Sequence, residues 1–174
     1  MFIIPGFIIA TITFPGVIVH EMAHQFFCRF TGTAVLDVCY FRIGNPAGYV
    51  VHEPAKSPGK TLVISIAPFF VNTIIGALIA APAAMSQDLE QPDPLNLFLL
   101  WLGISIAMHA FPSTGDARSL WTSLHKESWW LRALIAPIVA IIFIGAVGSM
   151  VWLDVIYGVA VGFGLPKLWV AMFA

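Results

Sequence analysis

The sequence has few charged residues. Asp, Glu, Lys and Arg make up 10% of its 174 residues, whereas soluble domains average about 25%. Hydrophobic residues make up 59% of the chain. This composition argues against an ordinary soluble enzyme domain and predicts a protein that folds mostly in lipid.

Basic runs and cysteine-rich motifs are also missing. The eight Lys and Arg residues are scattered, and the formal net charge is −1, which argues against a nucleic-acid partner. Cys28 and Cys39 fit neither a disulfide framework nor a CxxC metal site, so we expect two plain buried thiols. The first apolar run lacks the basic region of a signal peptide, and we expect a retained membrane helix there.

Apolar stretches of membrane-spanning length are abundant, and a membrane helix needs about 20 mostly apolar residues. We predict an α-helical integral membrane protein with one polytopic domain over residues 1–174. Its four to five transmembrane helices are expected at about residues 2–30, 61–85, 95–111, 131–153 and 155–173. Only a short turn near Asp154 separates the last two, which form one span or two. Gly158 and Gly162 have a small-xxx-small spacing that permits close helix packing and would allow a homo-oligomer.

The loops between these helices differ in the sign of their charge. Basic residues lie in or beside segments 31–60 and 112–130, namely Arg29, Arg42, Lys56, Lys60, Arg118, Lys126 and Arg132. Segment 86–94 carries only acidic residues, namely Asp88, Glu90 and Asp93. Because cytoplasmic loops collect Lys and Arg, we expect the basic loops inside the cell and the acidic loop outside. This predicts a multi-pass protein of the cell membrane whose first helix runs inward.

The first basic loop contains a structural signal of its own. AVLDVCYFRIGNPAGYVVHEP has two β-rich runs around a GNPAG turn, and Asn-Pro and Gly are typical of turns. We predict a β-hairpin over about residues 35–52, between the first two helices. Both of its faces carry apolar residues, so we expect it at or within the membrane boundary, packed on the helices.

The stretch VIVHEMAHQFF places three ionisable residues in a helix that is otherwise apolar. His20, Glu21 and His24 form an H-E-x-x-H motif, in which the two histidines share one helix face. Both imidazoles can bind one Zn²⁺ ion, and Glu21 can take a proton from a water molecule whose pKa the zinc lowers. Ionisable groups inside a bilayer are costly and need a partner, which favours a metal site. His20 lies about 13 Å of helix from Arg29, so we expect the site nearer the cytoplasmic side.

A catalytic zinc ion usually has three protein ligands, and the third should come from another segment at the same depth. The stretch MHAFPSTGDARSLW ends the third predicted helix on the cytoplasmic side. Asp116 is the expected third ligand, and His109 is the alternative. Pro112 and Gly115 would break the helix there. Asp116 would also serve as a helix N-cap, because a carboxylate can cap with one oxygen and bind a metal with the other.

These motifs resemble the site-2 protease family of intramembrane zinc metalloproteases, in a small prokaryotic-type form. That family carries HExxH on one membrane helix and N-x-x-P-x-x-x-x-D-G on a later one, whose Asp is the third ligand. The matching residues here are His109, Pro112 and Asp116. His109 replaces the Asn, the gap between Pro112 and Asp116 is one residue shorter, and Ala117 replaces the Gly. The resemblance covers about residues 10–120.

The resemblance implies roles for further residues. Asn72 resembles the Asn of a G-P-x-x-N element, with Ala67 in place of its Gly. It would face the zinc and assist the oxyanion or the substrate; the alternative is an interhelical hydrogen bond. His109 would assist in the same way, as a ligand or as a donor behind one. The open edge of the hairpin would pair with an unwound substrate strand.

Together, these features predict a zinc-dependent intramembrane endopeptidase with one Zn²⁺ ion per chain. Its expected substrate is the transmembrane segment of a membrane protein or peptide, cut near the cytoplasmic side. The alternative is a metal-binding membrane protein or divalent-metal transporter that uses the same histidines. The outer halves of the first two helices hold few polar residues, which disfavours a transport pathway.

Overall fold

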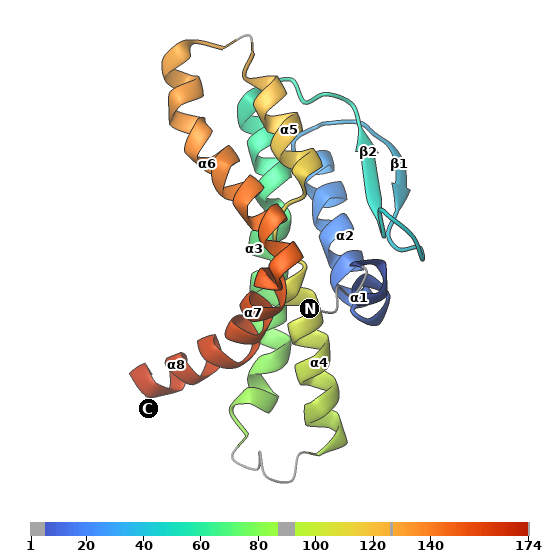
Figure 1. Ribbon diagram of the computed structural model, residues 1–174, viewed down its shortest axis with the longest axis vertical. Coiled ribbons are helices and arrows are strands. Elements are labelled where there is room, and N and C mark those ends of the chain that lie inside the picture. The colour runs from blue at the N-terminus through green and yellow to red at the C-terminus, as the bar shows by residue number, and fades with distance from the viewer. Residues whose placement is uncertain (1–5, 87–92, 126, 174) are drawn as a thin grey trace.

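The computed structural model describes residues 6–86, 93–125 and 127–173. Its helices are α1 (Gly6–Ile12), α2 (Phe14–Phe30), α3 (Pro58–Ala84), α4 (Pro94–Met108), α5 (Thr114–Ser123), α6 (Trp129–Gly148), α7 (Leu153–Val159) and α8 (Leu165–Phe173). The turns η1 (Ser149–Val151) and η2 (Ala160–Gly164) flank α7, and the strands are β1 (Val35–Cys39) and β2 (Tyr49–His52). Figure 1 shows α3 running through the centre of an elongated molecule, where it contacts α2, α4 and α5.

The prediction of a mostly helical protein is confirmed, and candidate membrane spans are present. Among the described residues, α3 and α6 are each long and apolar enough to cross a membrane, and α1 with α2 would make a third candidate span. This gives two or three spans by length and composition, fewer than the four to five predicted. The difference arises because α4 has 15 residues and the C-terminal segment is divided among α7, η2 and α8.

The first predicted helix is divided in two. α1 and α2 meet at an angle of 90°, and Thr13 is the residue between them. Pro15 stands in the first turn of α2, where its missing N–H leaves no hydrogen bond unmade. The same missing donor prevents the helix of α1 from continuing through this point. Residues 2–5 of the predicted helix lie outside the described residues.

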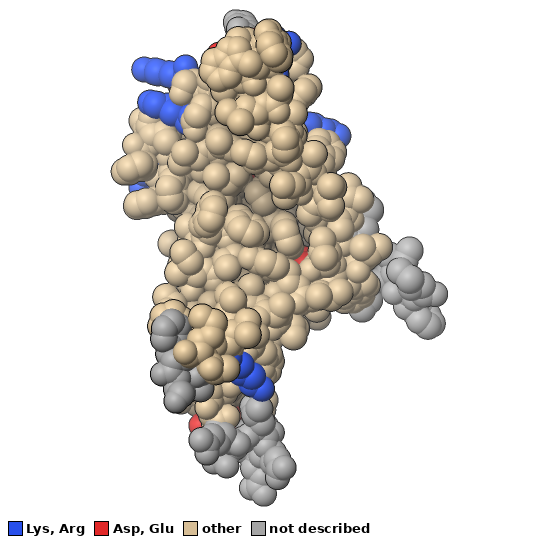
Figure 2. Space-filling view, turned by 90° about the vertical axis from the view of Figure 1, so that its left-hand side faces the viewer, with Lys and Arg blue, Asp and Glu red and all other residues tan. Residues whose placement is uncertain are grey.

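Large apolar side chains are exposed on α3 and α6, where a soluble protein would avoid a patch of this size. They include Phe70, Ile74, Leu78, Leu134, Ile141 and Ile144. Figure 2 shows most of the visible Lys and Arg side chains near the upper end, above a broad surface with almost no charge. This distribution is what a protein with its middle in lipid requires.

The basic loops meet at one end of the molecule. Lys60 Nζ donates to the Thr31 carbonyl at the end of α2, at 2.6 Å. Arg132 Nε donates to the Leu124 carbonyl at the end of α5, at 2.9 Å. In Figure 1 the start of α3 and the loop between α5 and α6 lie at the same end, opposite the start of α4. Three of the charged residues used to predict the topology lie outside the described residues, namely Asp88, Glu90 and Lys126.

Glycines allow α4 to pack closely on two neighbours. A Cβ atom on Gly76 of α3 would lie 2.7 Å from the Gly103 carbonyl oxygen of α4. Cβ atoms on Gly158 and Gly162 would lie 3.0 and 2.8 Å from atoms of Ile104, also in α4. The predicted small-xxx-small pair therefore packs within the chain. A homo-oligomer through these glycines stays a prediction, and it would have to share a face that α4 already covers.

The prediction of a β-hairpin after the first helix is confirmed. β1 and β2 pair antiparallel, with an irregularity between Val35 and Asp37. The hairpin lies against α2, and Tyr40 Oη donates to Gln25 Oε1 of that helix at 2.5 Å. The hairpin is thus fixed to the helix that carries the H-E-x-x-H motif.

Candidate metal centre

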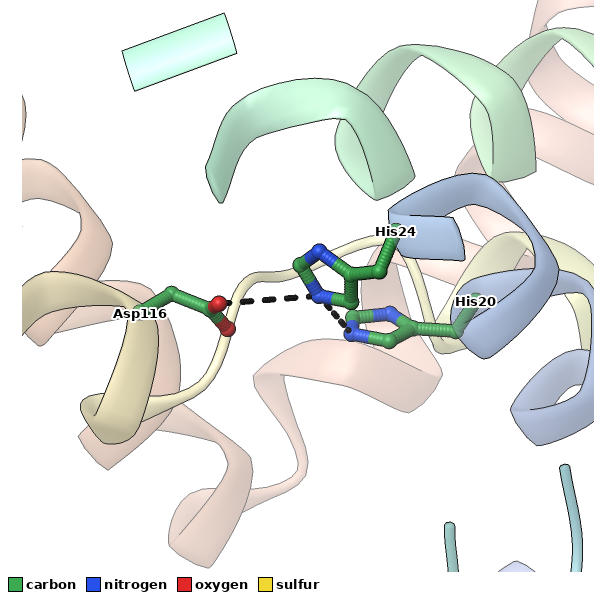
Figure 3. Close-up of side chains that lie close together, drawn as sticks. All are labelled: His20, His24 and Asp116. Carbon is green, nitrogen blue, oxygen red and sulfur yellow. Dashed lines mark hydrogen bonds and ion pairs between the residues drawn. The ribbon is translucent and has the colours of Figure 1, made fainter. Parts of the chain in front are cut away.

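α2 and α5 bring His20, His24 and Asp116 together, as Figure 3 shows. One nitrogen or oxygen atom from each residue lies within 4.8 Å of the other two. The two Nε2 atoms are 3.2 Å apart, and His24 Nε2 lies 3.6 Å from Asp116 Oδ1. Residues far apart in the sequence therefore direct their donor atoms at one point.

Backbone carbonyls orient both imidazoles. His20 Nδ1 donates to the His109 carbonyl at 2.7 Å, and His24 Nδ1 donates to the Ile64 carbonyl at 3.0 Å. Because a carbonyl can only accept, each Nδ1 carries the proton, and the Nε2 atom of each neutral ring presents a lone pair. Histidines that bind metals are commonly held by such contacts to the other ring nitrogen.

Asp116 divides its oxygens between its own helix and the histidines. Oδ2 accepts from the Ser113 backbone N–H at 2.8 Å and from Ser113 Oγ at 2.7 Å. Ser113 Oγ in turn accepts from the Asp116 N–H at 3.2 Å. This is a capping box with Ser113 as the N-cap, so Asp116 occupies the third helical position and not the predicted N-cap. Oδ1 is the oxygen that faces His24.

The donor set fits a divalent cation. Two imidazole lone pairs and one carboxylate oxygen converge, and lone pairs at this separation repel unless a positive charge lies between them. No Lys or Arg stands among the described residues that line the adjoining cavity, so these residues supply no basic side chain there. Two histidines and a carboxylate, with further positions left open, are a ligand set of catalytic zinc sites.

Glu21 lines the same cavity, which has a volume of about 800 Å³. The side chain is mostly buried and is covered by the tip of the hairpin. A Cβ atom on Gly48 would lie 2.7 Å from Glu21 Cγ, so only a glycine allows the hairpin to approach this closely. The cavity is also lined by α1, β2, the segment between α4 and α5, and the start of α7. The carboxyl group thus lies beside His20, His24 and Asp116, inside a space large enough for part of a peptide.

Asn72 is fully buried and bonds to backbone groups of two helices. The two N–H groups of its Nδ2 are shared among the carbonyls of Gly16 at 3.1 Å, Ile106 at 3.0 Å and His109 at 3.2 Å. Asn72 Oδ1 has no partner among the described residues. These contacts join α3 to α2 and to the end of α4, which favours the interhelical alternative over an amide presented to the substrate.

The side chain of His109, the alternative third ligand, lies apart from the group of three. Its Nε2 is 2.8 Å from Thr13 Oγ1 at the bend between α1 and α2. The Thr13 hydroxyl donates its proton to the Ile9 carbonyl at 2.7 Å, so His109 Nε2 is the donor in this contact. The Thr13 contact was not predicted, because it depends on a bend that the apolar pattern does not mark.

The region that contains these residues matches a known protein family. Residues 13–127 match the DUF3267 family, which is described as "Putative zincin peptidase". No curated protein and no solved structure matches the chain significantly. The matched region covers more than half of the 174 residues and runs from Thr13 past the H-E-x-x-H motif, the hairpin and Asp116. The chain therefore belongs to the DUF3267 family.

Proposed function

We propose that this zincin peptidase is an intramembrane endopeptidase of the site-2 protease type. It hydrolyses a peptide bond within or near a transmembrane segment of another membrane protein. The observation that carries the proposal is the group of His20, His24 and Asp116 beside Glu21, in a chain whose α3 and α6 are long and apolar enough to cross a membrane.

The residues divide the chemistry between them. His20, His24 and Asp116 would hold one Zn²⁺ ion, which would act as a Lewis acid and lower the pKa of a water molecule from 15.7 towards about 7. Glu21 takes the proton of the attacking water on its carboxylate and passes it to the leaving amine. His20 and His24 direct their Nδ1 protons away from the cavity, to backbone carbonyls, so proton transfer falls to Glu21.

β2 offers a backbone edge to the substrate. The Glu53 N–H donates to the Ala34 carbonyl at 2.9 Å, and alternate residues along an antiparallel pair bond to the partner strand. Val51 therefore continues the pairing with β1, whereas Val50 and His52 direct their backbone groups to the open edge. Val50 and His52 line the cavity. A helical substrate has to be unwound before it is cut, and an edge of this kind pairs with the extended strand.

Proline at position 50 tests this edge. Val50→Pro removes one outward N–H, and the loss of a hydrogen bond worth about 0.5–1.5 kcal/mol should reduce cleavage roughly 2- to 12-fold. The inward pairing is kept, because an edge proline is tolerated where its N–H faced away from the sheet. Val50→Ala retains the N–H and is the matched control. The test measures cleavage of a fluorescent transmembrane peptide in liposomes, together with the zinc content of each variant. Equal cleavage by Val50→Pro and Val50→Ala would contradict the pairing of β2 with the substrate.

The charge distribution supports a cytoplasmic position for the site. Most of the basic residues lie in or beside the loops that follow α2 and α5. The start of α3 and the loop between α5 and α6 lie at one end of the molecule, and basic loops are typically cytoplasmic. The site lies on α2 and α5, nearer that end than the start of α4. In this arrangement α4 and the segment from α7 to α8 join α1–α2, α3 and α6 as the four to five membrane segments of a plasma-membrane protein.

Metal removal tests the proposed function as a whole. The purified protein in liposomes is expected to carry one zinc ion per chain and to cut a transmembrane peptide. Chelation should abolish nearly all cleavage, and added Zn²⁺ should restore it. Zinc flux into the liposomes without cleavage would instead favour the metal-transport alternative, and a protein that neither cuts nor binds zinc would refute both.

A further inference from the structure

The segment between α4 and α5 interrupts the helix, and this frees one backbone carbonyl and one backbone N–H. Both of these groups form hydrogen bonds with side chains of the candidate metal site. In a continuous helix the His109 carbonyl would accept from the Ser113 N–H, four residues later. Pro112 disfavours helical backbone in the residue before it, and the helix stops. The freed carbonyl accepts from His20 Nδ1 at 2.7 Å, and the freed N–H donates to Asp116 Oδ2 at 2.8 Å. One break therefore supplies a contact to each of two metal-binding side chains.

The His109 carbonyl is itself held from two directions. Asn72 Nδ2 donates to it from α3 at 3.2 Å, while bonding at the same time to Gly16 of α2. The imidazole of His109 is tied to Thr13 Oγ1 at 2.8 Å. Asn72 is fully buried, so its amide has no water to exchange with these carbonyls. The acceptor of His20 is thus fixed by the middle of α3 and by the bend before α2.

We propose that Asn72, His109 and Thr13 form a positioning network for the zinc ligand His20. None of the three contacts the metal; they fix the carbonyl that sets the ring orientation of His20. Without the network, the Nε2 atom of His20 is free to turn away from the point where His24 and Asp116 converge. The proposal rests on the proposed metal site and explains why a histidine occupies position 109, where its side chain reaches Thr13 and its backbone serves His20.

The expected effect is on metal affinity. Contacts behind metal ligands typically change metal affinity or activity by 10- to 100-fold when they are removed. A network that served only to pack the helices would lower stability and leave the zinc affinity of the folded protein unchanged. Zinc affinity, measured by competition with a chelator on the full chain in detergent, separates the two roles without any cleavage assay.

The first test compares neighbouring residues of α3. Asn72→Leu removes the donor at similar volume and is expected to weaken zinc binding about 10- to 100-fold. It should also alter the absorption spectrum of the Co²⁺-loaded protein and lower kcat more than it changes KM. Thr73→Val is the matched control, since Thr73 Oγ1 contacts Tyr157 Oη at 2.7 Å and not the site. Its zinc affinity should stay within about twofold of that of the wild type.

The second test compares two threonines and does not depend on the folding of Asn72→Leu. The hydroxyls of Thr11 and Thr13 each donate to the carbonyl four residues before, at 2.7 Å. Only Thr13 also contacts His109. Thr13→Val is expected to weaken zinc binding roughly 10-fold, and Thr11→Val is expected to leave it unchanged.

Wild-type zinc affinity in both folded Asn72→Leu and Thr13→Val would overturn the positioning role and assign these contacts to helix packing. If Asn72→Leu does not fold, the Thr13→Val result decides alone. A wild-type protein that binds no zinc would refute the metal site, and with it the proposed function. Loss of affinity in the variants beside normal binding by the wild type and both controls is the result that the network predicts.

Discussion

Glu21→Gln is expected to keep one zinc ion per chain and to lower kcat by about 10²- to 10⁴-fold, the usual contribution of a general base. Glutamine has the size of glutamate but cannot accept the proton of the attacking water. His20 and His24 keep their carbonyl partners in this variant, so the metal should stay bound. Single-turnover cleavage of a transmembrane peptide, beside metal analysis of the same sample, measures both quantities.

Glu53→Gln is the matched control for this change. Glu53 follows β2 and is exposed, so the same loss of a carboxylate should leave both cleavage and zinc content at wild-type values. Cleavage by Glu21→Gln at the wild-type rate would contradict the role of Glu21. Loss of zinc from Glu21→Gln would instead show that Glu21 helps to hold the metal.

Asp116→Asn is expected to weaken zinc binding by more than about 100-fold, beyond the usual cost of removing a contact behind a ligand. The substitution removes the negative charge of Oδ1 that faces His24. An asparagine oxygen still accepts from the Ser113 N–H, so the start of α5 keeps a cap. The expected result is therefore a large loss of metal with little change in the unfolding temperature of the metal-free protein.

Ser113→Ala separates the capping role from metal binding. It removes the hydroxyl of the capping box and is expected to lower the free energy of unfolding by about 0.5–2 kcal/mol. Zinc affinity should fall less than in Asp116→Asn, because the Ser113 N–H still donates to Asp116 Oδ2. Chelator competition and thermal unfolding of the two variants measure the contrast. Normal zinc binding by Asp116→Asn would contradict the role of Asp116 as a ligand and would favour His109 as the third ligand.

The features predicted correctly from the sequence are those with a local pattern. The turn residues between two β-rich runs predicted the hairpin, and the i, i+4 spacing predicted that His20 and His24 share a helix face. The pairing of these histidines with Asp116 was reached from loop charges, because topology restricts which helix ends lie at the same depth. Turn residues and helix spacing act over a few neighbouring residues, and loop charges fix which helix ends lie on the same side of the membrane.

The remaining features depend on partners that have no sequence pattern. The carbonyls that hold His20 and His24 are backbone groups, which every residue possesses. The bend at Thr13 turned one predicted span into two short helices, although the apolar pattern continues across it. The sequence allows two roles for Asn72, because an amide in a membrane helix looks the same in the sequence whether it bonds to a neighbouring helix or to a substrate.

Under the proposed function, the size of the cavity limits how much of a transmembrane substrate enters it at once. A helical turn with its side chains, about 11 Å across and 5.4 Å high, occupies roughly 500 Å³. The cavity of about 800 Å³ is therefore smaller than two helical turns, whereas a helix that crosses a bilayer has five or six. Under the proposed function, most of the substrate would stay in lipid during the cut, and only a short unwound segment would enter the cavity. Selection among substrates would then depend on how easily a helix opens at one place, and less on the residues along its length.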